Sequence, residues 1–222
     1  MRELLPLFPL DRVLFPGEAL PLYAFEERHR RMVRDVLDGP GPGCIGVIAI
    51  REGRESGTGG VRALHEIGCT ATLRQAKEQD DGRFVLVTVG TKRFRLAGLD
   101  HSRPYPRGEV DLLGEDTGDQ TAARLTALAV HRAFRAYVEA LAGPGAGPVQ
   151  IPDLSGDPVG LSYLVAETMI LDLPVKQSLL AEPDALCRLT TERALLARET
   201  TLLRTFPSTP APGLSRSRYS SN

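Results

Sequence analysis

The chain has 222 residues, of which 42% are hydrophobic and 25% are charged. This composition is typical of a soluble globular protein, and the length allows an ample buried core. The formal net charge of −1 argues against a nucleic-acid partner, because binding a phosphate backbone requires a clearly basic face.

Cysteine usage and the absence of long apolar stretches indicate the cellular compartment. Cys44, Cys69 and Cys187 are odd in number and far apart, which argues against a zinc site or a disulfide framework. The N-terminus lacks the long apolar segment of a signal peptide, and no stretch approaches the ~18 apolar residues of a membrane span. We expect a cytoplasmic protein with no metal, no cofactor and no membrane partner.

The first part of the chain, residues 1–115, alternates short apolar runs with turn signals and is expected to be β-rich. Proline breaks its first run, which predicts an edge strand or an extended arm. One segment changes to helical spacing, and a Gly-Pro repeat ends it. Together these patterns predict a compact, barrel-like sheet. The predicted strands are residues 4–8, 20–24, 44–50, 64–74, 84–89, 92–96 and 108–113, and the predicted helix is residues 26–38.

The second part, residues 116–206, has helical periodicity throughout. Asp119 or Thr117 is expected to cap its first helix, and Asp157-Pro158 predicts the start of the second. Leu173-Pro174 is expected to end that second helix, with a helical turn after it.

A final long helix is predicted from Pro183 onward, with Leu189, Leu196 and Leu203 seven residues apart. Three leucines make a short seam, so packing within the chain is favoured over a coiled-coil dimer. Residues 207–222 are rich in Pro and Ser and are expected to be disordered.

The common catalytic and ligand-binding motifs are absent from the sequence or incomplete in it. The nucleophile motifs G-x-S-x-G and S-x-x-K are absent. Glu26 and His29 share one helical face, but a di-metal site would need a second such motif, so we interpret them as a surface pair. The glycines of residues 53–60 lack the lysine of a phosphate-binding loop. We therefore expect no catalytic residue, no cofactor-binding residue and no metal ligand.

Several short motifs carry a family resemblance through their joint order. Residues 5–10 read LPLFPL, residues 13–17 read VLFPG, and residues 26–30 read EERHR. Residues 67–71 read IGCTA and residues 90–96 read GTKRFRL. The segment LPVKQSLL follows at residues 173–180. In this order, over roughly residues 4–203, they resemble the N-terminal substrate-recognition region of Lon-type proteases.

The resemblance implies a fold and a role. The implied fold is α+β, with a PUA-like β pseudo-barrel in residues 1–115 and an α-helical bundle in residues 116–206. The implied role is non-catalytic binding of unfolded or tagged polypeptides, or of a dedicated protein partner, as an adaptor or chaperone-like module. The chain would lack the ATPase and protease domains, and it would be a monomer or a dimer. The residues that carry the family pattern, interpreted as structural, are Phe15, Pro16, Gly17, Arg28, Gly68, Gly90 and Arg93.

Two positions for a peptide groove are open at this point. One is the edge of the proline-interrupted first strand, since extended peptides pair with free strand edges. The other is a cleft between the β-rich and helical parts. RNA binding, which PUA-like barrels perform elsewhere, and a small hydrolase activity remain the alternative functions.

Overall fold

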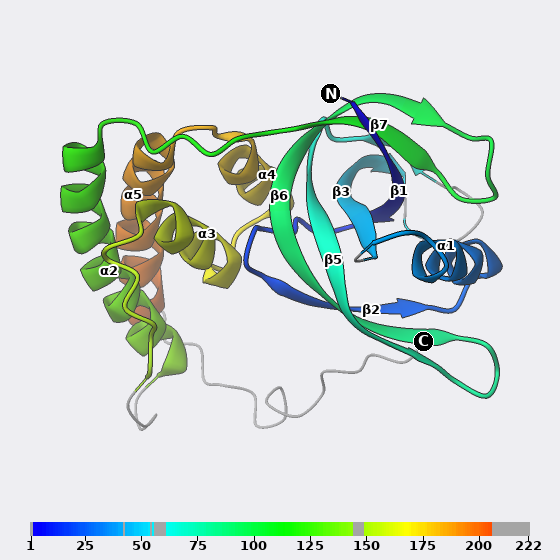
Figure 1. Ribbon diagram of the computed structural model, residues 1–222. Helices are drawn as coiled ribbons and strands as arrows, with labels where there is room; N and C mark the ends of the chain where they lie inside the picture. Colours follow the sequence, from blue (N-terminus) through cyan, green and yellow to red (C-terminus); the bar gives the residue numbers. More distant parts are fainter. Residues whose placement is uncertain (1, 42, 54, 56–60, 144–148, 206–222) are drawn as a thin grey trace.

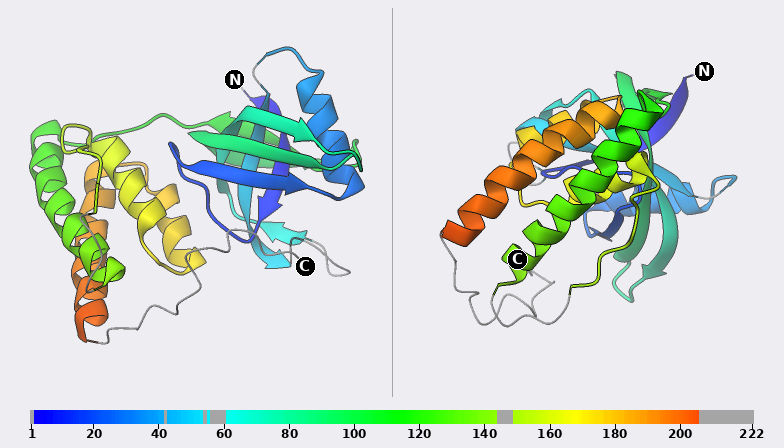
Figure 2. Two further views of the ribbon diagram at one scale, coloured as in Figure 1. Left: turned by 90° about the horizontal axis from the view of Figure 1, so that it is seen from below. Right: turned by 90° about the vertical axis from the view of Figure 1, so that its left-hand side faces the viewer.

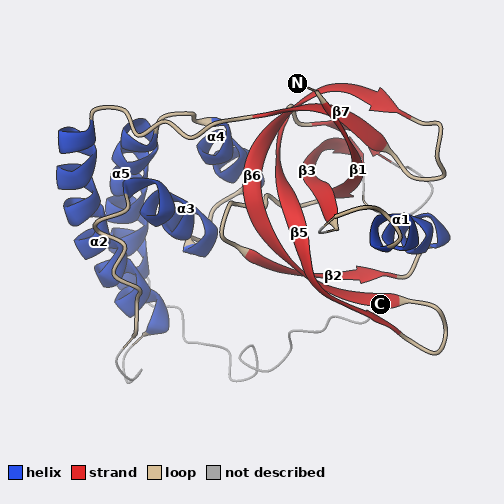
Figure 3. Cartoon of the chain, viewed as in Figure 1, coloured by secondary structure: helices blue, strands red, loops and turns tan. Residues whose placement is uncertain are grey.

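The computed structural model describes residues 2–41, 43–53, 55, 61–143 and 149–205. The strands gather in one body together with α1, and the other four helices lie together beside it (Figure 1). Figure 3 shows the same separation by type of secondary structure. In chain order the elements are β1 Glu3–Leu10, β2 Ala19–Ala24, α1 Glu27–Leu37, β3 Cys44–Gly53, β4 Val61–Leu64, β5 Ile67–Glu78, β6 Phe84–Asp100, β7 Arg107–Leu112, α2 Gln120–Ala142, α3 Pro158–Thr168, α4 Leu173–Ala181 and α5 Ala185–Thr205.

The sheet is mostly antiparallel and closes on itself. Neighbouring strands are paired in the order β1, β7, β6, β5 and β3, and β3 returns to β1 through a parallel pairing. The other two strands lie outside this ring, with β2 on β6 and β4 on β3. Closure removes most of the free edges that an open sheet would expose.

The expectation that β1 is an edge strand is wrong. Residues 3–6 pair with β7 and residues 7–10 pair with β3, so β1 closes the ring. Proline is tolerated because alternate residues of a strand point away from a given neighbour. The N–H of Leu7 donates to the carbonyl of Pro106 (2.9 Å), so at Pro6 the backbone faces away from β7 and no ladder bond is lost.

Two predicted strand boundaries in the long hairpin are also wrong. Residues 84–89 and 92–96 form one strand, β6, because β6 stays paired with β5 on both sides of a β-bulge, with Gly90 opposite Ala71 and Arg93 opposite Cys69. Residues 64–74 are divided between β4 and β5, and β5 continues to Glu78. The hairpin turn contains Gly82 with a φ of +76°, as the Asp81-Gly82 signal predicts.

Helices α2 and α3 begin at their predicted capping residues, whereas one predicted helix end is wrong. Asp119 accepts a hydrogen bond from the Ala122 N–H (2.7 Å) and Asp157 accepts one from the Gly160 N–H (3.0 Å). Leu173-Pro174 does not end a helix but begins α4, because proline fits the first turn, where an N–H has no helical partner. The predicted disordered tail lies outside the described residues.

Three large hydrophobic clusters and a smaller one, which lies on β1, β3, β6 and β7, organise the interior of the described residues. One fills the ring of strands, and a second joins α2, α3 and α5, where Leu189 and Leu196 are fully buried. The leucine repeat of α5 therefore packs within the chain, against helices that include α2 at its side (Figure 2). The third cluster lies where the strands meet the helices.

Candidate functional site

The third cluster, which we call the junction, is built from both parts of the chain. Phe15 contributes a fully buried ring from the link between β1 and β2, and Tyr163 of α3 lies 6.3 Å from it between ring centroids. The side-chain amide of Gln177 donates to the carbonyl of Ile67 (2.9 Å) and adds a polar connection from α4 to β5. Buried side chains fill the junction at this part of the boundary.

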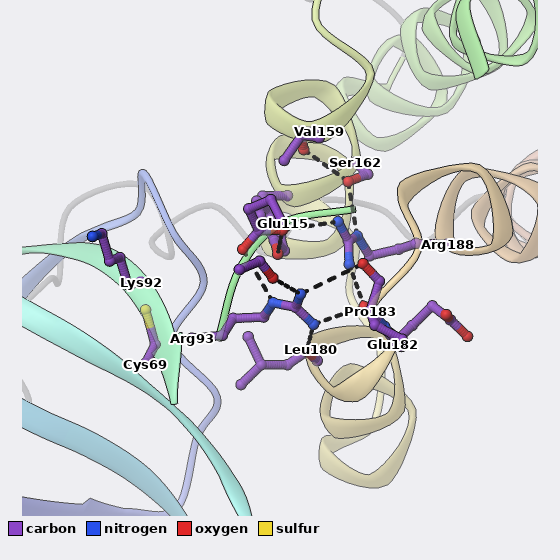
Figure 4. A network of polar contacts seen from close by, with 12 residues as sticks. Cys69, Lys92, Arg93, Glu115, Val159, Ser162, Leu180, Glu182, Pro183 and Arg188 are labelled. Atoms are coloured by element: carbon purple, nitrogen blue, oxygen red, sulfur yellow. Dashed lines mark hydrogen bonds and ion pairs between the residues drawn. The ribbon is translucent and has the colours of Figure 1, made fainter. Parts of the chain in front are cut away.

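Arg93 is the polar centre of the junction. Its side chain, 1% exposed, extends from β6 toward the connection between α4 and α5 (Figure 4). The guanidinium donates to the carbonyls of Leu180 (3.2 Å) and Glu182 (2.9 Å) and to the Glu115 carboxylate (3.2 Å). The expected pairing of Arg93 with a carboxylate is thus present, and it holds β6 to the helices.

Glu115 links Arg93 to a second buried arginine. Its other carboxylate oxygen accepts from the Tyr163 hydroxyl (2.6 Å) and lies 3.8 Å from the guanidinium of Arg188. Arg188 of α5 stacks over the Tyr163 ring at 4.1 Å and donates to Ser162 (2.8 Å). Burial raises the pKa of the Tyr163 hydroxyl, which keeps it as a neutral donor. This network joins β6, α3 and α5 through buried polar contacts.

Two further family-pattern glycines lie where a side chain would not fit. A Cβ at Gly90 would lie 2.1 Å from the Phe15 carbonyl oxygen. A Cβ at Gly68 would lie 2.4 Å from the Phe94 ring and 2.6 Å from the Val47 carbonyl oxygen. Both glycines allow two main chains, or a chain and a ring, to approach closely.

The remaining family-pattern residues lie elsewhere. Pro16 and Gly17 form the turn after Phe15, where Gly17 has a φ of +89° and donates to the Gly90 carbonyl (2.9 Å). Arg28 binds Glu26 (2.7 Å) and the Glu55 carbonyl (3.0 Å) at the start of α1. The structure brings Phe15, Gly17, Gly90 and Arg93 toward the junction and leaves Arg28 apart, so the seven residues do not form one surface.

The interpretation of His29 as a surface residue is wrong. His29 is buried and stacks on Phe8 at 4.4 Å between ring centroids. Burial, together with the charge of Arg28, lowers the pKa of His29 to about 4. The ring is therefore neutral at pH 7 and packs as part of the core.

An exposed apolar surface, which motif analysis missed, lies on the outside of β2 and β6. Side chains of β2 alternate between core and solvent, and pairing places Pro21 beside Val87 and Tyr23 beside Val85. Phe25 continues the row after β2. We call this surface the outer face; it consists of Ala19, Pro21, Tyr23, Phe25, Val85 and Val87.

Two aromatic rings dominate the outer face. Tyr23 is 40% exposed and Phe25 is 52% exposed, and their rings stack at 6.1 Å between centroids. The Tyr23 hydroxyl donates to Gln79 (3.2 Å), and the Arg83 guanidinium lies 5.5 Å from its ring centroid. These contacts hold Tyr23 in place at the surface. Strand alternation in residues 19–25 was the one sequence signal that could have identified this face.

Among the described residues, no helix combines the length and apolar character that crossing a membrane requires.

Comparisons with known proteins show consistent similarity to Lon proteases. The chain is 25% identical over 205 residues to Lon protease 2 of Myxococcus xanthus, covering 91% of this chain and 24% of that protein. It is also 25% identical over 203 residues to the Lon protease of Escherichia coli K12, covering 90% of this chain and 25% of that protein. The chain thus spans about a quarter of the length of these relatives.

Solved structures show the same fold. A Lon N-terminal domain protein from Xanthomonas campestris superimposes with a TM-score of 0.62 at 25% identity, over 86% of this chain and 98% of the other. The N-terminal domain of the Mycobacterium avium complex Lon protease gives a TM-score of 0.64 at 18% identity, over 90% and 98%. The family model for the ATP-dependent protease La (LON) substrate-binding domain matches residues 4–198, and the chain therefore belongs to the LON substrate-binding domain family.

Proposed function

We propose that this protein is a non-catalytic module that binds unfolded polypeptides through the outer face, acting as an adaptor or a chaperone-like protein in the cytoplasm. The proposal rests on the stacked, solvent-exposed rings of Tyr23 and Phe25 on one face of the sheet. Aromatic rings that are already held in place lose little conformational entropy when they bind apolar side chains.

The family and the electrostatics of the chain support this proposal. The matched model describes a substrate-binding domain, and substrates of ATP-dependent proteases are polypeptides. Apolar capture suits chains of many sequences, because the hydrophobic effect is non-directional. A net charge of −1 gives no corresponding support for RNA.

The arrangement of the molecule suits this role. We propose that residues 1–115 form a PUA-like subdomain, to which the closed ring of strands lends support, and that residues 116–206 form a helical subdomain. The junction fixes the two parts through Arg93 and Phe15. Clients would then meet a preformed surface, which lowers the entropic cost of binding.

Fluorescence anisotropy tests the proposal. The labelled probe is reduced, carboxymethylated lactalbumin, which stays unfolded without denaturant, and native lactalbumin is the folded comparison. We expect saturable binding of the unfolded probe alone, without ATP and without cleavage on a gel. Replacing both Tyr23 and Phe25 by Ser should weaken binding at least tenfold, because each buried aromatic anchor contributes on the order of 1–2 kcal/mol.

A matched variant controls for general loss of apolar surface. Leu125 and Leu128 of α2 are 65% and 44% exposed, and they lie on the helical part, away from the outer face. Replacing both by Ser should leave the affinity unchanged. Equal weakening by the two double variants would remove the outer face from the proposal, and absence of binding by the wild-type protein would remove the function itself.

A further inference from the structure

The sheet continues beyond the outer face onto β5, which pairs with the other side of β6 (Figure 1). Pairing places Lys77 of β5 opposite Val85, and Val85 opposite Tyr23. Residues directly opposite each other in antiparallel strands project from the same face of the sheet, with their Cβ atoms ~5 Å apart. Tyr23, Val85 and Lys77 therefore form a row across the sheet, and the lysine stands two strands away from the exposed aromatic ring.

Strand alternation keeps the neighbouring acidic residue away from this row. Glu78 pairs with Phe84, whose ring is buried in the core, so these two residues project from the opposite face of the sheet. There the Glu78 carboxylate binds the guanidinium of Arg34 on α1 (3.0 Å). Glu78 is thus already paired, and the ammonium group of Lys77 stands beside apolar side chains.

Lys77 is exposed and forms no ion pair within the described part of the chain. Every Asp and Glu lies in that part, so no further carboxylate side chain is left to neutralise it. Arg74 and Asp80, three residues before and after Lys77, also lack ion pairs there, but their charges are opposite. Lys77 therefore gives this border of the outer face a net positive charge.

The other cation beside the Tyr23 ring is neutralised within the hairpin turn. The guanidinium of Arg83 lies 5.5 Å from the Tyr23 ring centroid and is ion-paired with Asp81. Hydrogen bonds from Arg83 lower the pKa of Asp81, so the carboxylate stays ionised at neutral pH and its charge offsets that of Arg83. Attraction of an acidic ligand is therefore expected at Lys77 rather than at the turn.

We propose that the outer face binds, in preference to other unfolded segments, those in which an acidic residue lies two to four positions from an aromatic or branched apolar residue. The apolar side chain packs on Tyr23 and Val85, and the carboxylate binds the ammonium group of Lys77. In an extended chain these positions lie ~7 Å and ~13 Å apart, which brackets the ~10 Å of two strand spacings. The inference rests on the proposed function and names the class of segment that the same face selects.

Charge contributes selectivity here, whereas apolar contact contributes most of the affinity. The hydrophobic effect is non-directional and accepts many sequences. One exposed ion pair adds a few-fold at most, and a basic segment would meet repulsion from Lys77. The expected preference is therefore modest and sensitive to salt, because exposed charges are screened.

Three labelled 15-residue peptides test this preference. Each has three copies of a five-residue unit, which is Phe-Val-Glu-Ser-Glu, Phe-Val-Gln-Ser-Gln or Phe-Val-Lys-Ser-Lys, so the apolar residues are the same and only the charge differs. In anisotropy titrations at about 50 mM NaCl, the Glu peptide should bind about threefold more tightly than the Gln peptide, and the Lys peptide more weakly than both. At about 500 mM NaCl the three affinities should converge.

Lys77→Gln removes the proposed partner of the acidic residue. The affinity for the Glu peptide should fall about threefold, and that for the Gln peptide should stay unchanged. Lys92→Gln is the matched control, because Lys92 is also exposed but stands next to Arg93, where β6 approaches the junction (Figure 4). It should leave both affinities unchanged, and thermal melting checks that both variants fold.

The preference and the proposed function fail in different ways. Equal binding of the Glu and Gln peptides at low salt, or equal weakening by the two lysine variants, would overturn the preference. If no peptide binds while unfolded lactalbumin still binds through Tyr23 and Phe25, the preference is likewise excluded and the proposed function stands. If lactalbumin does not bind either, the proposed function is lost together with the preference.

Discussion

Glu192 of α5 is a buried carboxyl group without a hydrogen-bond partner among the described residues. It is fully buried, and neither of its oxygens is bonded. Burial raises the pKa of this carboxyl well above 4.5, and the Arg188 guanidinium opposes the rise. An uncharged carboxyl costs less to bury than a carboxylate, so burial inside the helical part favours the neutral acid form of Glu192.

Glu192 should therefore make stability fall as pH rises. The folded state binds this proton more tightly than the unfolded state, in which the pKa of the carboxyl is near 4.5. The free energy of unfolding therefore decreases above that pH until the carboxyl of the folded state ionises. The slope would reach about 1.4 kcal/mol per pH unit. Urea unfolding at pH 5 and pH 8 should show that Glu192→Gln loses part of this decrease.

A carboxylate on the same helix serves as the comparison. Glu199 is partly exposed and ion-paired with Arg198, so Glu199→Gln makes the same substitution on α5 while leaving the buried Glu192 in place. If Glu192→Gln and the wild type change equally between the two pH values, Glu192 ionises normally and the assignment is wrong.

Individual elements follow local signals where those signals are complete within a few residues. Asp119 and Asp157 cap α2 and α3 as their sequences predict, because a cap depends only on the first helical turn. Proline gave the wrong result at Pro6 and Pro174, because its effect depends on strand phase or on its position within a helix turn. The strand phase at Pro6 is set by pairing with β7, which lies about a hundred residues further along the chain.

The cap of α3 offers a test at this scale. Asp157→Ala should lower the free energy of unfolding by about 1 kcal/mol, because the Gly160 N–H loses its acceptor. Asp153 bonds Ser155 in the loop before α3 and caps no helix, so Asp153→Ala should cost less. Urea unfolding of both variants measures the difference, and equal costs would contradict a capping role.

At the scale of the whole molecule, the junction joins parts that are remote in sequence. Arg93 bonds the carbonyls of residues 180 and 182, which lie 87 and 89 positions further along the chain. No periodicity could have predicted these partners, although a carboxylate was expected. The outer face was missed for a related reason, since Tyr23 and Val85 become neighbours only through pairing of β2 with β6.

Arg93→Met should uncouple the two parts. Glu115 and several carbonyls would lose a buried cationic partner, which costs about 3–5 kcal/mol. Scanning calorimetry should show a lower melting temperature and a transition broadened or divided between strands and helices. Lys92→Met, at the exposed neighbouring position, should change little. A single transition at the wild-type temperature for Arg93→Met would contradict this account of the junction.

The closure of the ring through β1 has a consequence for biosynthesis. Leu5 pairs with Gly108, so β1 leaves the ribosome long before its partner β7, the last strand of the described sheet in chain order. Contacts between such distant residues slow folding, and unpaired strand edges invite association between nascent chains. The ring can close only after β7 has emerged, so a chain interrupted before Arg107 would be left with an open sheet whose strand edges lack their partners.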